Sequence, residues 1–353
     1  MSIKKISIAV VVIILATLLT SCTSGSAAVN SYSGVAVSSD MVFFANGGKV
    51  SALRSSNGNL AWEYPEKISA KRLFYAQPVI VGEQVLVADY EYKLTSLNTL
   101  DGSENWIFSG AKGRYIDSPI VINDTIIAPN ADYSIYALDL NGKLKWTFTG
   151  GHAFWAQPVS DGNAVYVSCM DHFLYAIDLE KGSLLWKTEL GAALVSRPLL
   201  DETGRLFIGN IDGTYYAVSE KDGSKLWEQK MGSGVWAQAI LLEGKLYFGD
   251  QAGRVNILNS EDGKSIQYIE TDGAILGKGA VLEQGIVFGN ENGDLVMINF
   301  DGDKIWTRTV DGKIYGSLVF DGSQILVPVS GSTEPLVAMD SNGNENWSYS
   351  EKK

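Results

Sequence analysis

The amino-acid sequence predicts an all-β fold built from eight similar units, and three observations support this prediction. The chain of 353 residues contains 37 glycines, which is typical of a protein rich in tight turns. A Gly followed four residues later by a Trp recurs along the chain at intervals of about forty residues. Between these points lie short apolar runs separated by Asp-Gly and Asn-Gly pairs, and no long helical period follows the N-terminal segment.

The first element in the chain is a signal sequence over residues 1–21. Lys4 and Lys5 precede an apolar stretch of fourteen residues, 6–19, which is shorter than the ~20 residues of a spanning helix. The stretch ends in Leu-Thr-Ser-Cys22, which resembles the lipobox of bacterial lipoproteins. In that family the signal is cut before the Cys, and the Cys thiol receives a diacylglycerol. An ordinary signal peptide with an incidental Cys is the alternative.

From the lipobox we expect Cys22 to carry the lipid and residues 22–31 to form a flexible tether, because this segment is small and polar. The protein would then be anchored to a membrane outside the cytoplasm. That membrane is the outer membrane if the organism has one, and otherwise the outer face of the cell membrane. With Cys22 lipidated, Cys169 is the remaining thiol, so no intrachain disulfide can form.

Charge excludes one class of partner. The chain has 28 Lys and Arg against 40 Asp and Glu, a net charge of −12. Loss of Lys4 and Lys5 with the signal leaves 26 basic residues against the same 40 acids, or −14. Binding to the nucleic-acid backbone through bulk charge is therefore not expected.

The repeat has one slot per unit, four residues after a turn Gly. The slots are 39 to 44 residues apart and hold seven of the nine tryptophans and one glutamine: Trp62, Trp106, Trp146, Trp186, Trp227, Gln267, Trp306 and Trp347.

Each unit also contains four segments of strand character, as residues 155–159, 164–168, 173–178 and 184–188 illustrate for the fourth. Eight units of four antiparallel strands predict a single eight-bladed β-propeller over residues 32–350, in which radial packing protects the strand edges. A solenoid of stacked units is the structural alternative. The repeat does not show whether the ring closes with whole blades or with a strand shared between the termini.

The repeat resembles that of pyrroloquinoline-quinone-type propellers, most clearly in residues 136–146 and 175–186, and the resemblance covers nearly all of the chain after the signal. It implies that each slot Trp docks onto the neighbouring blade. Gln267 departs from the pattern, so we expect the sixth blade to be the least firmly docked.

Some propellers with this repeat are quinone-dependent dehydrogenases, which hold the quinone over a Trp and under a disulfide of adjacent cysteines, beside Ca²⁺. This chain has no adjacent cysteines and is much shorter than those enzymes. The histidines, His152 and His172, fall in loops, and the Asp-Gly pairs are explained as turns. The sequence therefore predicts a protein that is not an enzyme and has no cofactor and no metal.

Two features suggest binding surfaces. The first is an aromatic-x-Gln pair at the start of the inner strand in the second, fourth and sixth units: Tyr75 and Gln77, Trp155 and Gln157, Trp236 and Gln238. The members of a pair share a strand face, so they would surround one mouth of the channel. They form either a polar-aromatic ligand surface or ordinary packing in which the amides satisfy loop backbone.

The second feature is a long link between the first two units, residues 65–72, which contains Lys67, Lys71 and Arg72. The next link on this face contains Lys112 and Arg114. A basic spot on an acidic protein can meet an acidic partner or a lipid headgroup. A solvated run of charge is the alternative.

Taken together, the lipobox, the repeat and the missing catalytic residues most resemble the bacterial outer-membrane assembly lipoprotein family. That resemblance implies a lipid-anchored, monomeric propeller that serves as a protein-interaction scaffold for an envelope or outer-membrane protein. A ligand-binding or sensing propeller is the alternative function, and a quinone-dependent dehydrogenase is the third.

Overall fold

The computed structural model describes residues 33–38 and 40–351, and the expected signal, the tether and Cys22 lie outside these residues. Within them, 32 strands form eight four-stranded antiparallel sheets. The described part of the chain contains no helix long and apolar enough to cross a membrane. The predicted all-β, eight-bladed propeller is confirmed.

The first four blades follow one another from residue 34 to residue 189. Their strands are β1 (Gly34–Ser38), β2 (Met41–Asn46), β3 (Lys49–Arg54) and β4 (Leu60–Tyr64); β5 (Val79–Val81), β6 (Gln84–Ala88), β7 (Leu94–Asn98) and β8 (Glu104–Phe108); β9 (Ile120–Ile122), β10 (Thr125–Pro129), β11 (Ser134–Asp139) and β12 (Leu144–Thr149); β13 (Val159–Ser160), β14 (Ala164–Ser168), β15 (Phe173–Asp178) and β16 (Leu184–Glu189).

The last four blades complete the ring. Their strands are β17 (Leu199–Leu200), β18 (Arg205–Gly209), β19 (Thr214–Ser219) and β20 (Lys225–Lys230); β21 (Ile240–Leu242), β22 (Lys245–Gly249), β23 (Arg254–Asn259) and β24 (Ser265–Glu270); β25 (Ala280–Leu282), β26 (Gly285–Gly289), β27 (Asp294–Ile298) and β28 (Lys304–Thr309); β29 (Val319–Phe320), β30 (Ile325–Pro328), β31 (Leu336–Met339) and β32 (Glu345–Tyr349).

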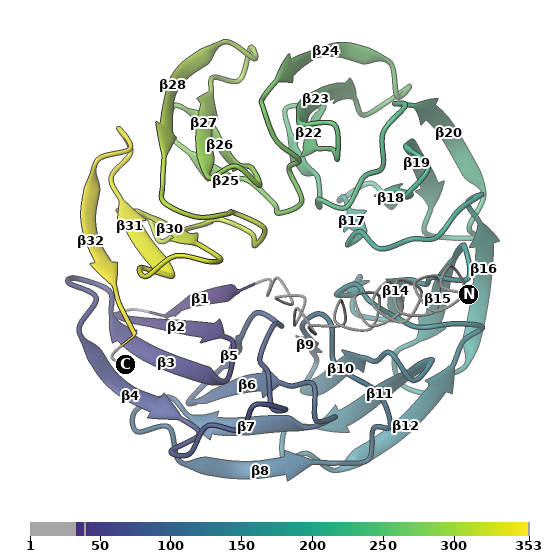
Figure 1. Ribbon diagram of the computed structural model, residues 1–353. Helices are drawn as coiled ribbons and strands as arrows, with labels where there is room; N and C mark the ends of the chain where they lie inside the picture. The colour runs from purple at the N-terminus through teal and green to yellow at the C-terminus, as the bar shows by residue number, and fades with distance from the viewer. Residues whose placement is uncertain (1–32, 39, 352–353) are drawn as a thin grey trace, which may run out of the picture. The chain divides into compact units, whose positions relative to one another are not determined.

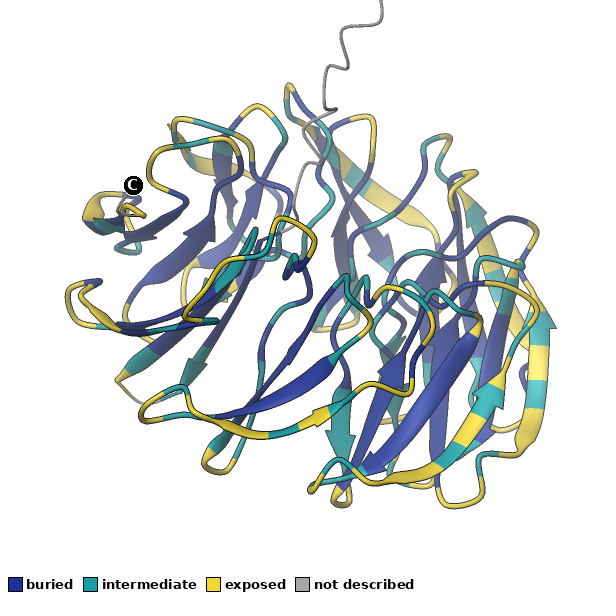
Figure 2. Ribbon diagram, turned by 60° about the horizontal axis from the view of Figure 1, so that its bottom comes forward, coloured by how far each residue is buried: buried dark blue, intermediate teal, exposed yellow. Residues whose placement is uncertain are grey.

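Each sheet runs in chain order from the axis to the circumference, so β1, β5, β9 and their equivalents lie innermost (Figure 1). The two middle strands are covered on both faces by neighbouring blades and are almost entirely buried, as in β10 and β14. The outermost strands alternate instead, with the pattern exposed, exposed, intermediate, exposed, intermediate, exposed in β12 (Figure 2). This difference explains why the middle strands read as continuous apolar runs and the outer ones as alternating runs.

A β-bulge separates the third and fourth strands of every described blade at the same place. In the third blade Ala137 pairs with Trp146 and Leu138 pairs with Leu144, so Lys145 is passed over. A bulge adds local twist and redirects the side chains beside it. Because it lies next to the slot residue, it sets the direction in which that side chain leaves the sheet.

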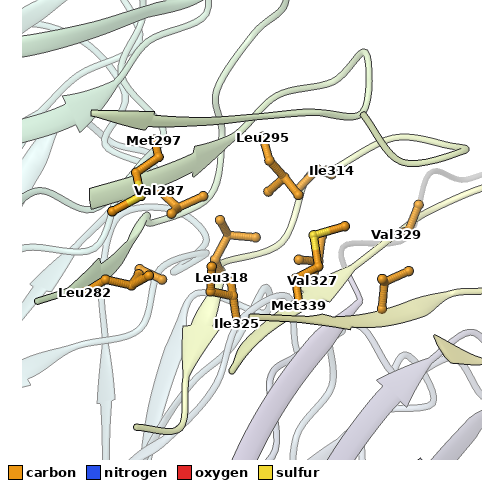
Figure 3. Close-up of a cluster of buried hydrophobic side chains, with 12 residues drawn as sticks. Leu282, Val287, Leu295, Met297, Ile314, Leu318, Ile325, Val327, Val329 and Met339 are labelled. Atoms are coloured by element: carbon orange, nitrogen blue, oxygen red, sulfur yellow. The ribbon is translucent and has the colours of Figure 1, made fainter. Parts of the chain in front are cut away.

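Blades join through apolar cores that lie between neighbouring sheets. Figure 3 shows the core between the seventh and eighth blades, where Leu282, Val287 and Met297 face Leu318, Ile325 and other side chains of the eighth blade. A comparable core joins the eighth blade to the first, with Val42 and Phe44 packed against Leu326 and Leu336. Within the described residues the ring closes with whole blades, since every sheet consists of four consecutive strands.

Candidate functional site

The slot tryptophans each donate a hydrogen bond to the next blade. The indole Nε1 of every one lies 2.9 to 3.1 Å from a backbone carbonyl oxygen in the turn between the third and fourth strands of that blade. The acceptors, in chain order, are the carbonyls of Thr99, Leu140, Leu179, Glu220, Ser260, Ser341 and Ser55. The last of these, from Trp347 to Ser55 at 2.9 Å, closes the ring.

The slot side chain also explains the turn Gly of the repeat. A Cβ on Gly182 would lie 2.5 Å from the Trp146 ring of the preceding blade, and the backbone φ there is +66°. Both the left-handed conformation and the close approach of the ring therefore require Gly at this position. The turn Gly of one unit thus contacts the slot Trp of the unit before it, and we call this Gly the seat of that Trp.

Gln267 occupies the slot of the sixth blade and keeps the hydrogen bond of the missing Trp. Its Nε2 donates to the Asp301 carbonyl oxygen at 2.7 Å, and its amide lies against Gly302 of the seventh blade. An amide N–H therefore replaces the indole N–H, while the area of the aromatic ring is lost.

The aromatic-x-Gln pairs lie just before the inner strands, not on them. The inner strand of the fourth blade begins at Val159, whereas the sequence predicted that it would begin at Trp155. The backbone N–H of Gln157 donates to Asp117 Oδ2 at 2.8 Å, and Pro158 has no backbone N–H. Neither residue can therefore donate a backbone hydrogen bond to a neighbouring strand. The expected shared strand face is therefore wrong for these residues.

The structure nevertheless brings the three aromatic residues to one place. Tyr75, Trp155 and Trp236 line a central cavity of about 130 Å³, together with Gln77 and Gln238.

The Gln amides serve the neighbouring backbone. Gln77 donates to the Val35 carbonyl at 2.7 Å, and Gln157 donates to the Pro119 carbonyl at 2.9 Å. Gln238 donates to the Pro198 carbonyl at 3.3 Å. Each bond reaches the inner strand region of the preceding blade, so the amides act as ties between blades.

Sequence reasoning did not select the charged residues of this cavity. The Arg197 guanidinium binds both carboxylate oxygens of Asp117, with Nε 2.9 Å from Oδ2, and its Nη1 donates to Gln157 Oε1 at 3.0 Å. Lys278 also lines the cavity, and its backbone is held by Ser317 and Leu318 of the eighth blade. In the repeat, Arg197 and Lys278 occupy the position that holds Gln in the second, fourth and sixth units. This shared position is the sequence feature that could have identified them as residues of the cavity.

The basic residues of the link between the first two blades differ in how far they are buried. Lys67 and Lys71 are exposed, but Arg72 is only 9% exposed. Its Nε lies 2.6 Å from Asp89 Oδ2, whose side chain is fully buried, and its guanidinium stacks over the Tyr64 ring at 4.9 Å. The assignment of Arg72 to a binding surface is therefore wrong, because an ion pair and aromatic faces hold it inside the protein.

A groove beside this link gathers the remaining basic and aromatic residues. It has a volume of about 570 Å³ and is lined by Lys71, Lys93 and Arg114, with Tyr90 and Tyr92 between them. The guanidinium of Arg114 lies over the Tyr90 ring at 5.0 Å. Glu91 is the acid among the described lining residues, so the groove has a net charge of +2.

The residues with catalytic or redox chemistry are dispersed. His152 and His172 are exposed in loops, and Cys169 is buried, with burial raising the pKa of its thiol to about 12. Within residues 33–38 and 40–351 no group of three or more His, Cys, Asp and Glu side chains is placed to hold a metal ion.

Comparison with known proteins places this propeller among related folds. The family described as outer membrane protein assembly factor BamB matches residues 24–149, 131–274 and 267–353. The crystal structure of BamB from Moraxella catarrhalis has a TM-score of 0.69 and 18% identity, and the match covers 84% of this chain and 90% of that one. No protein with a curated description matches the chain in sequence.

Two further solved structures share the fold. The computationally designed protein Ika8 matches with a TM-score of 0.73 and 15% identity, over 90% of this chain and 96% of its own. A europium-containing methanol dehydrogenase matches with a TM-score of 0.73 and 11% identity, over 84% of this chain and 82% of its own. At such identities these likenesses show the fold alone.

Proposed function

We propose that this chain, which belongs to the family described as outer membrane protein assembly factor BamB, is a non-catalytic scaffold of the bacterial envelope. In this proposal the propeller is anchored outside the cytoplasm by a lipid on Cys22 and holds another envelope protein during outer-membrane protein assembly. The family match, which spans residues 24–353 in three overlapping segments, is the observation that carries the proposal.

The cavity geometry argues against the quinone-dehydrogenase alternative. The central cavity measures about 130 Å³, well below the ~300–1,000 Å³ of typical cofactor pockets. The Arg197–Asp117 pair forms part of its wall, and no second cysteine stands beside Cys169 to form the adjacent disulfide of those enzymes. The residues present do not fit a bound quinone of that class.

The groove lined by Lys71, Lys93 and Arg114 is the surface that we assign to the partner. Its charge of +2 on a chain of net charge −12 favours an acidic segment as the occupant. Its two tyrosines supply amphipathic contact area of the kind that is enriched in protein interfaces. Ile68, which is 61% exposed, adds an apolar side chain to the link that leads to Lys71.

Charge reversal in the groove tests the scaffold function. The double variant Lys71→Glu with Arg114→Glu should reduce the amount of membrane protein that co-purifies from crosslinked envelopes about tenfold, which corresponds to about 1.4 kcal/mol. The matched control is Lys221→Glu with Lys230→Glu, two exposed lysines outside the groove. Equal recovery with both double variants, or no co-purifying membrane protein with the unaltered chain, contradicts the proposal.

The lipid anchor requires its own test. Cys22→Ala should abolish labelling by a radioactive or clickable fatty acid and leave the chain either soluble or with its signal retained. Labelling that persists in this variant would show that Cys22 is not the acylated residue.

A further inference from the structure

We infer that the central cavity is a binding site for a small carboxylate, held by Lys278 at the axis of the propeller. The site is separate from the groove that we assign to the protein partner, and it does not depend on the scaffold function. The inference rests on the charges of the cavity, on the apolar character of its wall and on its size.

The charges of the cavity leave one cation uncompensated. Asp117, Arg197 and Lys278 are the charged residues among the described lining residues, so the net charge is +1. Both carboxylate oxygens of Asp117 already have partners, because they accept hydrogen bonds from Arg197 and from the backbone N–H groups of Ser118 and Gln157. Lys278 takes part in none of the ion pairs of the described residues, although it also borders a second groove that is lined by Asp201, Glu202, Glu243 and Glu261.

Burial makes the uncompensated ammonium costly. Lys278 is partly buried, and burial, followed by the nearby charge of Arg197, lowers the pKa of its amino group. A desolvated cation without a counter-charge destabilises the folded state unless an anion joins it. An anion bound at this point would be attracted by both cations and would restore the charge balance.

The aromatic residues of the wall contribute apolar surface. Trp155 and Trp236 line the cavity, whereas their indole N–H groups are buried away from it and have no hydrogen-bond partner among the described residues. A ligand beside the Lys278 ammonium would therefore meet aromatic ring carbon atoms, which favours an anion with an apolar part.

Size and surroundings narrow the class of anion. The cavity volume of about 130 Å³ leaves room for a small molecule of several non-hydrogen atoms. The aromatic and aliphatic lining, including Tyr75, Val195 and Leu276, favours an anion with an apolar part over a fully hydrated inorganic ion. A short-chain carboxylate such as acetate has both properties.

Thermal unfolding of the full-length protein, purified in detergent, tests the site. Sodium acetate should raise the Tm by about 2 °C over sodium chloride at equal ionic strength, because a ligand that binds the folded state stabilises it. Acetamide, which is neutral and nearly isosteric, should leave the Tm unchanged. An equal shift with acetate and chloride, or with acetate and acetamide, would overturn the inference.

Variants separate a ligand-binding lysine from a structural one. Lys278→Met should keep or raise the Tm without acetate, since it removes a desolvated charge, and should abolish the acetate-dependent rise. Trp155→Ala, which removes an aromatic ring from the cavity wall, should reduce that rise. Lys313→Met is the matched control, because Lys313 is exposed on the link that precedes the eighth blade. An undiminished rise in both cavity variants contradicts the inference.

Discussion

The interface between the sixth and seventh blades differs from the other interfaces of the propeller in one slot residue. Elsewhere a Trp contributes both a hydrogen bond and a large aromatic surface to the next blade, as Trp146 does against Gly182 and the Leu179 carbonyl. Gln267 contributes the hydrogen bond alone. A slot Trp therefore has two roles, which are the hydrogen bond to the next blade and the packing of its aromatic ring. The propeller retains the hydrogen bond at every interface, whereas the interface after the sixth blade lacks the aromatic packing.

Polar contacts accompany the loss of the ring at this interface. The Phe300 carbonyl of the seventh blade accepts hydrogen bonds from Lys245 Nζ at 3.1 Å and from Tyr247 Oη at 2.8 Å. Lys304 Nζ of the seventh blade donates in the other direction, to the Glu270 carbonyl at 2.7 Å. Hydrogen bonds of this kind contribute only about 0.5–1.5 kcal/mol each, so the weaker docking of the sixth blade stays a prediction.

Removing the Trp that closes the ring should have the largest effect. Trp347 is 8% exposed, and Trp347→Ala deletes both its ring and its hydrogen bond to Ser55. We expect a loss of about 3–5 kcal/mol in the free energy of unfolding, measured by urea denaturation. A loss below about 1 kcal/mol would show that the slot does not hold the blades together.

Adding a methyl group to the seat should distinguish the two kinds of slot. Gly182→Ala and Gly302→Ala both place a Cβ at positive φ, with φ of +66° and +90°. At Gly182 the Cβ also meets the rigid Trp146 ring, whereas at Gly302 the nearest atom is the flexible end of Gln267. Strain of this kind costs about 1–3 kcal/mol, and Gly182→Ala should lie at the upper end of that range and Gly302→Ala at the lower. Equal losses in urea denaturation would mean that the ring does not occupy the seat tightly.

Truncating the exceptional slot residue should cost less. Gln267→Ala removes the hydrogen bond to the Asp301 carbonyl without removing an aromatic ring. The expected loss is about 1 kcal/mol in the same assay. A loss as large as that of Trp347→Ala would show that the two slots are energetically equivalent.

Restoring the repeat should have the smallest effect and the opposite sign. Gln267→Trp keeps an N–H donor and adds ring area over Gly302, so we expect a gain of about 0.5 kcal/mol. A destabilised variant would indicate that Lys245, Tyr247 and their neighbours have closed the space that a ring needs.

The sequence predicted the blades well because the signals within a blade are local. The second and third strands of the fourth blade were predicted at residues 164–168 and 173–178, and the structure has the same bounds. The inner strand begins four residues later than predicted, since Gln157 bonds to Asp117 of another blade. Asp117 lies forty residues before Gln157 in the sequence. The residues around Gln157 therefore do not indicate this contact, which competes with the local preference for a strand.

The binding surfaces were predicted less well for the same reason. Arg72 resembled Lys67 and Lys71 in the sequence, but Asp89, seventeen residues later, draws it into the interior. Lys278 and Arg197 lie eighty-one residues apart in the sequence, and the ring alone places both on one cavity. Residue type identified the candidate charges, whereas burial decided which of them are free to meet a partner.

The sequence by itself determined the number of blades, the slot in each and the turn Gly four residues before it, because each unit repeats the same short-range pattern of turns and apolar runs. The tertiary structure alone decided how the ring closes, with Trp347 docked on the first blade and no strand shared among the described residues. It also decided that Gln267 keeps the hydrogen bond of the slot and that Lys278 lies on the central cavity without an ion-pair partner among the described residues. These features depend on contacts between blades. The curvature of the propeller sets these contacts, whereas the spacing of residues along the chain does not.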